Sequence, residues 1–179
     1  MITYIYTICD ENERFINAYN QISASLLDGD EIIVQYDTVN GDPILLNLLN
    51  DNNIEYIEYE FDGNFSDMKN SAITHATNKW IVQLDGDESL GSDFLENIHE
   101  FIINKSQYDG FWVKRIDSNI DTDEIDELSS LTLIRIFRKL PWIKWSKPVH
   151  EQIEGATITH SYEYPILHKR TTEESSKVY

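Results

Sequence analysis

Residues 80–88 of this chain read Trp80-Ile81-Val82-Gln83-Leu84-Asp85-Gly86-Asp87-Glu88. The first five residues are mostly apolar, which predicts a short buried β-strand. Two carboxylates, Asp85 and Asp87, follow at the point where that strand would run out into a loop. Carboxylate oxygens are the hard ligands that Mg²⁺ and Mn²⁺ prefer. The segment therefore predicts a divalent cation site at a strand end, and we expect such a cation to carry a diphosphate.

This turn also fits a metal-free turn and a calcium loop. Asp-Gly-Asp turns satisfy backbone geometry without any metal. The oxygen-bearing side chains match five positions of an EF-hand calcium loop counted from Asp85, namely Asp85, Asp87, Ser89, Asp93 and Glu96. Two features argue against the calcium loop: Leu90 stands where its sharp turn needs glycine, and a strand-like run precedes it in place of a helix.

Composition indicates one folded domain. The chain has 179 residues, of which 41% are hydrophobic, and this combination is enough to bury a core and excludes a disordered protein. Its single cysteine, Cys9, excludes an internal disulfide and is compatible with a reducing cytosol. The apolar run Met1–Ile8 is too short to span a bilayer, and no other run approaches that length. We therefore expect no transmembrane segment and a cytoplasmic location.

The net charge of -18 is unevenly distributed. Residues 1–104 hold 3 Lys and Arg against 20 Asp and Glu, whereas residues 105–179 hold 11 against 12. The stretch from Ser129 to His150 has no acidic residue, and its basic residues are Arg135, Arg138, Lys139, Lys144 and Lys147. A solvated basic strand pair and a surface that meets an anionic substrate both fit this stretch. Duplex nucleic acid is not an expected partner, because binding it requires phosphate neutralisation.

The first half of the chain alternates predicted strands and helices. Strands are expected over residues 2–9, 32–36, 54–59 and 80–84. Helices are expected from Glu13, from the Asp42-Pro43 start signal, and over residues 66–76 and 92–103. Strand-helix repetition of this kind predicts an α/β fold of three layers around a largely parallel sheet.

The pattern changes after residue 104. Strands are expected over residues 111–116, 131–137, 142–145 and 156–160. A solvated acidic loop is expected over residues 121–127, and residues 171–179 are expected to be a mobile helix or a disordered tail. Neither an internal repeat nor a low-complexity linker separates the two halves, so we expect residues 1–179 to form a single domain.

The order of motifs along the chain supplies a resemblance. The motifs are Thr7–Glu13, Asp37, Phe65–Ala72, Trp80–Leu90, Leu133–Arg138 and Val149–Glu151. Taken together they resemble a family 2 glycosyltransferase with the GT-A fold, and they are most similar to the bacterial subgroup that includes lipopolysaccharide-core glucosyltransferases. The resemblance runs from residue 1 to about His168. It implies metal-dependent, inverting transfer of a sugar from a nucleoside diphosphate, UDP first among the candidates, to a saccharide or other hydroxyl acceptor, anionic acceptors included.

The resemblance also assigns residues. It divides the chain into a nucleotide-sugar-binding half, residues 1–104, and an acceptor-side half, residues 105–170. In the family, the loop after the first strand and the acid that ends the second strand hold the nucleoside, which here means Thr7, Cys9, Asp10, Glu11 and Asp37. A basic residue followed by Asn precedes the D-x-D motif, and it is Lys69-Asn70 here. Lys keeps the positive charge near the diphosphate but loses the bidentate fork of the usual Arg.

The D-x-D motif itself is assigned to the donor and its metal. Asp85, with Gly86, reaches toward the ribose, and Asp87 binds Mn²⁺ or Mg²⁺, with Asp85 as a second candidate ligand. His168 best fits the family's C-terminal histidine that ligates the metal, and His150 is the second candidate. A packed or surface imidazole that binds no metal fits either position as well.

Chemistry supplies an independent reason for these residue types. A leaving diphosphate must be neutralised, which a carboxylate-held cation does as a Lewis acid. A base must also deprotonate the acceptor hydroxyl, and the candidates are Glu151 and Glu88. Glu151 is preferred because it corresponds to the His-Glu pair of the resembled family, whereas Glu88 could instead orient the metal loop.

Two further function classes stay open. A nucleotidyltransferase would need a glycine-rich phosphate loop near the first strand, but Cys9–Asn12 has no glycine. A noncatalytic calcium or acidic interaction module is favoured by the total charge and weakened by the strand before Asp85. Within the glycosyltransferase hypothesis we expect non-processive transfer, because a Gln-x-x-Arg-Trp signature and appended membrane helices are both absent from the sequence.

Overall fold

The computed structural model describes residues 1–119, 121–122 and 125–171 and is built around an eight-stranded sheet of order β3-β2-β1-β4-β7-β6-β10-β5. Four neighbouring strands pair in parallel, as expected: β1 (Ile2–Ile8), β2 (Glu31–Asp37), β3 (Ile57–Tyr59) and β4 (Trp80–Asp85). The helices between them are α1 (Asn12–Ser23), α2 (Pro43–Asp51) and α3 (Phe65–His75). Because these strands are parallel, their carboxyl ends meet at one edge of the sheet.

The second half of the chain extends the same sheet. Its elements are β5 (Glu88–Leu90), α4 (Ser92–Asn104), β6 (Gly110–Asn119), β7 (Ile125–Arg138), β8 (Lys144–Ser146), β9 (Gln152–Glu154) and β10 (Thr159–Arg170). Strand β7 joins the halves by pairing antiparallel with both β4 and β6, and β10 runs parallel to β6 and antiparallel to β5. The sheet is therefore mixed, with most of its strand pairs parallel.

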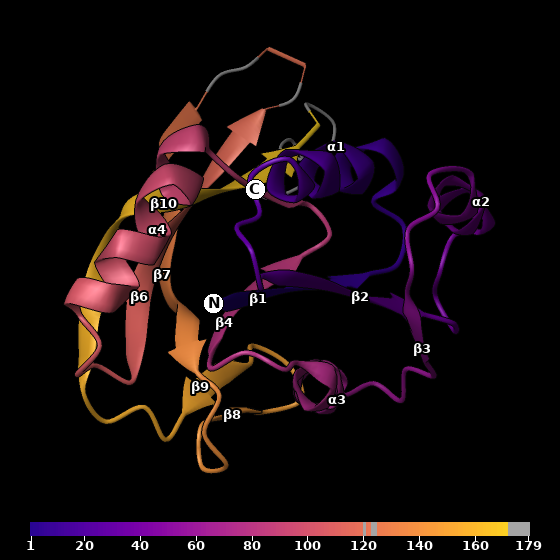
Figure 1. Cartoon of the computed structure of the whole chain (residues 1–179). Helices are drawn as coiled ribbons and strands as arrows, with labels where there is room; N and C mark the ends of the chain where they lie inside the picture. The colour runs from indigo at the N-terminus through magenta and orange to yellow at the C-terminus, as the bar shows by residue number, and fades with distance from the viewer. Residues whose placement is uncertain (120, 123–124, 172–179) are drawn as a thin grey trace.

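Two apolar clusters cover the two faces of the sheet (Figure 1). Side chains of β1 alternate between them: Tyr4 and Tyr6 join the cluster under α1, α2 and α4, whereas Ile5 joins the cluster with α3 and β8. Figure 1 shows α1 and α3 on opposite sides of the strands, with the β8–β9 hairpin beside α3. This is the predicted three-layer arrangement, and burial of both faces is its main driving force.

Local signals placed two of the helix starts. Asp42 caps α2 by accepting a hydrogen bond from the backbone N–H of Ile44 at 2.8 Å, and Pro43 is the first helical residue. The helix start predicted at Asp42-Pro43 is confirmed. Asn64 caps α3 in the same way, with bonds from Ser66 and Asp67. These caps fix where the two helices leave the loops at the carboxyl edge of the sheet.

The structure corrects several expected elements. The strand predicted over residues 54–59 is only Ile57–Tyr59, because the N–H of Ile54 still bonds to the carbonyl of Leu49 at the end of α2. The acidic loop predicted over 121–127 is wrong at its end, since Ile125 and Asp126 already pair with β6. Of the strand predicted over 156–160, only the last two residues belong to a strand, as the start of β10. The tail predicted over 171–179 lies outside the described residues except for residue 171.

Strands β5, β9 and most of β10 were not predicted, because each is short or mixes charged and apolar residues. Among the residues described, no helix is both long and apolar enough to cross a membrane.

Candidate active site

A cavity of about 690 Å³ lies at the carboxyl ends of β1, β2 and β4. Parallel pairing brings these strand ends together, and side chains line the cavity from the end of each strand and from the loops after β1 and β4. Ten of the residues predicted from the sequence line the cavity: Thr7, Cys9, Glu11, Asp37, Lys69, Asp85, Asp87, His150, Glu151 and His168. Residues that are far apart in the sequence thus meet at one site, although their individual roles stay predictions.

Asp85 is held by two cationic side chains. Its Oδ1 lies 2.7 Å from Lys69 Nζ, and its Oδ2 lies 2.8 Å from the Arg135 guanidinium. Burial alone would raise the pKa of Asp85, but Arg135 and Lys69 hold that pKa well below its usual range. Thr7 Oγ1 adds a long hydrogen bond of 3.5 Å to Oδ1. Both carboxylate oxygens are already neutralised, so this position does not favour Asp85 as a direct metal ligand.

Glu88 is buried behind the turn. As the first residue of β5 it has no exposed surface, and its carboxylate contacts Arg135 at 2.8 Å and the backbone N–H of Asp85 at 3.0 Å. Burial raises the pKa of Glu88 to about 7, against the opposing charge of Arg135. Glu88 is not among the described residues that line the cavity. It is therefore placed wrongly for a base that takes a proton from an acceptor, and its contacts are those of a residue that orients the turn.

The strand and turn around Asp85 also decide against the calcium loop. Strand β4 precedes the turn and β5 follows it at once, so the segment is strand-turn-strand and not helix-loop-helix. Ser89 and Leu90 are buried within β5. An EF-hand does not form here.

Lys69 connects Asp85 to Glu151. The Lys69 side chain is only 2% exposed, and its Nζ lies 2.5 Å from Glu151 Oε1 and 4.8 Å above the ring of Trp145. Glu151 lines the cavity from the loop before β9, with 18% of its side chain exposed. Lys69 therefore shares its charge between two carboxylates, which places a positive group in the cavity wall next to the predicted base.

Asp87 meets His168 at the cavity wall. The His168 Nε2 lies 2.8 Å from Asp87 Oδ2, and Asp87 keeps 30% of its side chain exposed. Burial would lower the pKa of His168, but hydrogen bonds to Asp87 and Asp117 raise it. Two adjacent ligands of an octahedral Mg²⁺ or Mn²⁺ stand about 3 Å apart at ordinary bond lengths. The separation of these two atoms fits such a pair, and it is His168, of the two predicted histidines, that contacts Asp87.

The loop after β1 is folded around Glu11. Its Oε2 accepts hydrogen bonds from the backbone N–H groups of Cys9 at 2.8 Å and Asp10 at 3.0 Å. Burial raises the pKa of Glu11 to about 7, and burial, followed by the charge of Glu11, also raises the pKa of the Cys9 thiol. Gly86 of the neighbouring turn packs against this carboxylate, since a Cβ there would lie 2.4 Å from Glu11 Cδ. Asp10 is exposed and is not among the described lining residues.

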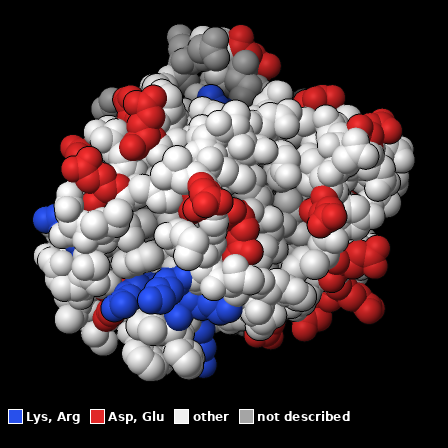
Figure 2. Space-filling view, viewed as in Figure 1, with Lys and Arg blue, Asp and Glu red and all other residues white. Residues whose placement is uncertain are grey.

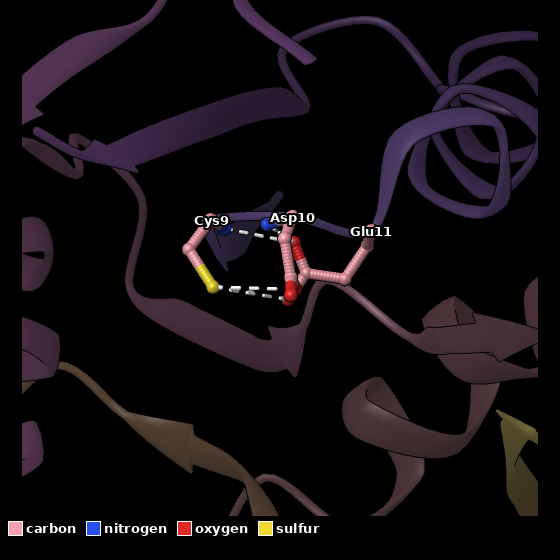
Figure 3. A group of neighbouring side chains, drawn as sticks. All are labelled: Cys9, Asp10 and Glu11. Carbon is pink, nitrogen blue, oxygen red and sulfur yellow. Dashed lines mark hydrogen bonds between the residues drawn. The ribbon is translucent and has the colours of Figure 1, made fainter. Parts of the chain in front are cut away.

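Cys9, Asp10 and Glu11 turn their side chains to the same side (Figure 3). Their potential ligand atoms lie within 4.8 Å of one another, a spacing that could hold a metal ion. However, Glu11 is occupied by backbone N–H groups, and a raised thiol pKa disfavours the thiolate that binds metals. We assign no metal to this group.

Asp37 and Asn70, both predicted to bind the nucleotide, differ in position. Asp37 lines the cavity at the end of β2, and its Oδ1 also closes the next turn by accepting from the N–H groups of Val39 and Asn40. The Asn70 side chain donates to the carbonyl of Trp145 and accepts from its N–H, both at 2.9 Å. Asn70 is outside the described cavity lining, so its observed role is to tie α3 to β8.

Sequence reasoning missed several residues of the site. Arg135 was noted as part of a basic stretch and of the Leu133–Arg138 motif but was given no role, although it contacts both Asp85 and Glu88. Arg115, Trp145 and the apolar side chains of Leu131 and Leu133 also line the cavity. Alternation along the strand predicted at 131–137 places Leu133 and Arg135 on one face, but no local signal gives the register that brings this face to Asp85.

The basic stretch does not form one surface at the cavity. Arg138 is paired in register with Trp80 and lies over its ring, and the N–H of Lys139 bonds to the carbonyl of Lys79. These residues are at the start of β4, about 16 Å from its carboxyl end at the usual rise per residue. Figure 2 shows Lys and Arg side chains gathered on this part of the molecule. This arrangement does not support the hypothesis that Arg138 and Lys139 guide an anionic acceptor to the cavity.

Comparisons with known proteins give the family and support the fold. The model of glycosyl transferase family 2 matches residues 5–161. The structure of S. aureus TarS 1-349 in complex with UDP-GlcNAc matches 100% of this chain and 62% of that chain, with a TM-score of 0.64 and 13% identity. The structure of S. aureus TarS matches 99% of this chain and 38% of that chain, with a TM-score of 0.61 and 12% identity.

A third structure, S. aureus TarS 1-349 in complex with UDP, matches 99% of this chain and 63% of that chain, with a TM-score of 0.57 and 12% identity. At this identity the likenesses show the fold alone, and the chain spans less than two thirds of these solved chains. A search of curated proteins finds no match. The finer similarity to lipopolysaccharide-core enzymes stays a prediction.

Proposed function

The chain belongs to the family 2 glycosyltransferases with the GT-A fold, and from that premise we propose that it transfers a sugar from a nucleoside diphosphate to an acceptor hydroxyl with a divalent cation, Mn²⁺ or Mg²⁺. The observation that carries the proposal is the meeting of Asp87 and His168 at the wall of a cavity that Thr7 and Asp37 also line. A carboxylate and an imidazole at cis-ligand separation suit a cation that binds a diphosphate.

The donor is proposed to be a UDP-sugar. TarS structures contain UDP-GlcNAc or UDP, and their fold is the fold of this chain. Asp37 is placed to accept a hydrogen bond from the base or the ribose, because it lines the cavity and its Oδ2, which accepts from the Asn40 side chain at 2.8 Å, can accept a second hydrogen bond. Asp85 stays anionic between Arg135 and Lys69, so it offers an acceptor for a ribose hydroxyl without binding the metal.

Glu151 is the proposed general base. It lines the cavity and has exposed carboxylate surface, which Glu88 lacks. In a single displacement the acceptor oxygen attacks the anomeric carbon, the bond from that carbon to the phosphate oxygen breaks, and the hydroxyl proton passes to Glu151. This step inverts the anomeric centre. When bound, the cation would neutralise the charge on the leaving diphosphate.

The acceptor side is proposed to be the part of the cavity bordered by apolar side chains. Leu131 and Val149 are half exposed at the cavity, at 50% and 56%, and Phe65 is 43% exposed. Sugar rings and other hydroxyl acceptors pack their C–H faces on such surfaces. Transfer of single sugars is proposed over processive synthesis, because the sequence has no Gln-x-x-Arg-Trp signature.

Calorimetry tests this proposal. We expect UDP to bind the wild-type protein in the presence of Mn²⁺ and to bind much more weakly in EDTA. Asp37→Asn keeps the Oδ1 that closes the turn but loses a charged acceptor, so UDP affinity should fall about tenfold at a cost of about 1–2 kcal/mol. Asp109→Asn is the matched control, because Asp109 also accepts hydrogen bonds from two backbone N–H groups, those of Thr157 and Ile158, and is not among the described lining residues. Absence of Mn²⁺-dependent UDP binding would overturn the proposal.

A further inference from the structure

His168 has a carboxylate on each side. Parallel pairing of β10 with β6 sets His168 directly beside Asp117. The Nδ1 of the imidazole lies 2.8 Å from Asp117 Oδ1, while Nε2 lies 2.8 Å from Asp87 Oδ2. The imidazole is therefore a bridge between the turn at the cavity wall and a carboxylate behind it.

Asp117 is itself held in place. Ser129 donates its hydroxyl to Asp117 Oδ2 at 2.7 Å, and the Arg170 guanidinium lies 3.4 Å from the same oxygen. Only 14% of the Asp117 side chain is exposed, and Asp117 is outside the described cavity lining. Of its three partners His168, Ser129 and Arg170, it is His168 that lines the cavity, so we expect an effect on the site to pass through His168.

Both ring nitrogens face a carboxylate oxygen at 2.8 Å, so without a cation either nitrogen can donate a hydrogen. A cation held with Asp87 would need the lone pair of Nε2. The hydrogen of the neutral imidazole would then stand on Nδ1, where Asp117 Oδ1 accepts it. Arg170 Nε also donates toward Nδ1, but at the longer distance of 3.2 Å.

We propose that Asp117 is a positioning residue that fixes the tautomer and ring orientation of His168, so that Nε2 and the Asp87 carboxylate together hold the divalent cation. Metal-binding imidazoles usually donate their second N–H to a carboxylate or carbonyl in this way, and loss of that partner costs 10–100-fold in metal affinity. The inference rests on the proposed function, since it concerns the metal of that site.

The backbone supports the same arrangement. The N–H of Lys169 bonds to the carbonyl of Asp87 at 2.7 Å, so β10 anchors the Asp85–Glu88 turn next to His168. This anchor does not involve the Asp117 side chain. Substituting Asp117 should therefore disturb the imidazole while leaving the turn and the nucleoside part of the cavity in place.

The test compares the Mn²⁺ dissociation constants of variants, measured by calorimetry in saturating UDP. Asp117→Asn keeps the shape of the side chain but can present an amide N–H to Nδ1, which favours the wrong tautomer. We expect Mn²⁺ to bind 10–100-fold more weakly, with UDP affinity in EDTA unchanged. Asp109 directly precedes the first residue of β6, at the end of the strand away from Asp117. Asp109→Asn should leave both constants unchanged.

A double-mutant cycle separates positioning from a general structural role. If Asp117 acts through His168, Asp117→Asn should weaken Mn²⁺ binding in the wild-type background and have little further effect in His168→Ala. Equal effects in both backgrounds would overturn the inference, as would Mn²⁺ affinity of Asp117→Asn within about twofold of wild type. Those results leave the proposed function standing, whereas a wild-type protein without Mn²⁺-dependent UDP binding would overturn both.

Discussion

Asp85 and Asp87 stand two residues apart in one turn, yet their surroundings are opposite. Asp85 has a cationic partner on each oxygen, Lys69 and Arg135. Asp87 has a single imidazole partner, His168, and otherwise faces the cavity. Two carboxylates that look alike in the sequence are therefore different chemical groups in the fold.

The difference indicates that the two carboxylates have different roles in the site. Around Asp85 the protein balances the charges itself, through a chain of contacts that runs from Glu88 by way of Arg135 to Asp85 and on to Lys69 and Glu151. An incoming cation would have to compete with two fixed cations there. Around Asp87 the ion pair found among the described residues is with His168, and we propose that a bound metal ion supplies the balancing charge. We therefore expect substitutions near Asp85 to change stability and catalysis, and those near Asp87 to change metal binding.

The largest expected effect is at Glu151, the far end of the Asp85 network. Glu151→Gln keeps size and shape but cannot take the acceptor proton, so turnover should fall by about 10²–10⁴. Binding of the nucleotide sugar should be nearly unchanged. The measurement is initial rate with a working acceptor, or the slow hydrolysis of the donor by water.

A matched control for that prediction is Glu154→Gln, a glutamate three residues further on, exposed on β9. It should turn over at the wild-type rate. If Glu151→Gln also turns over at the wild-type rate, Glu151 is only the counter-ion of Lys69 and is not the general base.

Removing Arg135 should break the balance around Asp85. Arg135→Leu leaves the buried Glu88 with the more distant guanidinium of Arg115, 3.9 Å away. Breaking a buried charge pair in this way destabilises by about 3–5 kcal/mol. Urea unfolding at pH 8 measures the loss. At pH 5 the loss should be smaller, because the raised pKa of Glu88, about 7, leaves that carboxyl protonated there.

Arg138→Leu is the control for this variant, three positions along the same strand and over the ring of Trp80. Its effect should be about 1 kcal/mol or less, as for other partly exposed substitutions. Equal destabilisation by the two variants would mean that Arg135 contributes only as part of the strand.

The most direct contrast is between Asp87→Asn and Asp85→Asn. Loss of the Asp87 charge should weaken Mn²⁺ binding in saturating UDP by about 100-fold or more, beyond the 10–100-fold typical of an outer partner. Asp85→Asn should change Mn²⁺ affinity by less than about tenfold, because Asp85 is neutralised by the protein. Equal losses in calorimetry would show that both carboxylates ligate the metal.

Local chemistry made part of this molecule predictable. Apolar periodicity and the Asp42-Pro43 cap gave the strands and helices of the first half, because each signal lies within a few residues of what it specifies. The D-x-D turn could be placed at a strand end for the same reason. Most of the other site residues were assigned through the resemblance to the family, and ten of the predicted residues line one cavity.

The rest depends on register between distant strands. Arg135 reaches Asp85 because β7 pairs with β4, and Asp117 meets His168 because β10 pairs with β6. No residue near Arg135 or Asp117 in the sequence encodes either partner. Burial also decides which carboxylates can react. Glu88 follows the D-x-D motif directly in the sequence, yet the fold buries its side chain completely.

The smallest expected effect is a pH dependence at Glu11, which lies beside the turn and whose pKa is raised by burial and, in smaller part, by the charge of Asp87. The pKa of Glu11 rises from 4.5 to about 7, so the folded protein keeps a proton that the unfolded chain has lost between these values. The free energy of unfolding gained from this group is complete below pH 4.5 and is lost as pH rises through about 7.

Glu11→Gln should remove this slope, because its neutral amide oxygen still accepts the N–H groups of Cys9 and Asp10. In urea unfolding with EDTA the variant and the wild type should be nearly equal at pH 4.5, and the variant should be more stable by about 1–3 kcal/mol at pH 8. Glu13→Gln, on the exposed side of α1, should run parallel to the wild type. With Mn²⁺ and UDP present the difference at pH 8 should shrink, since a cation at Asp87 offsets the charge that raises the pKa of Glu11. A difference that Mn²⁺ leaves unchanged would place the metal away from Asp87 and remove the contrast between the two carboxylates.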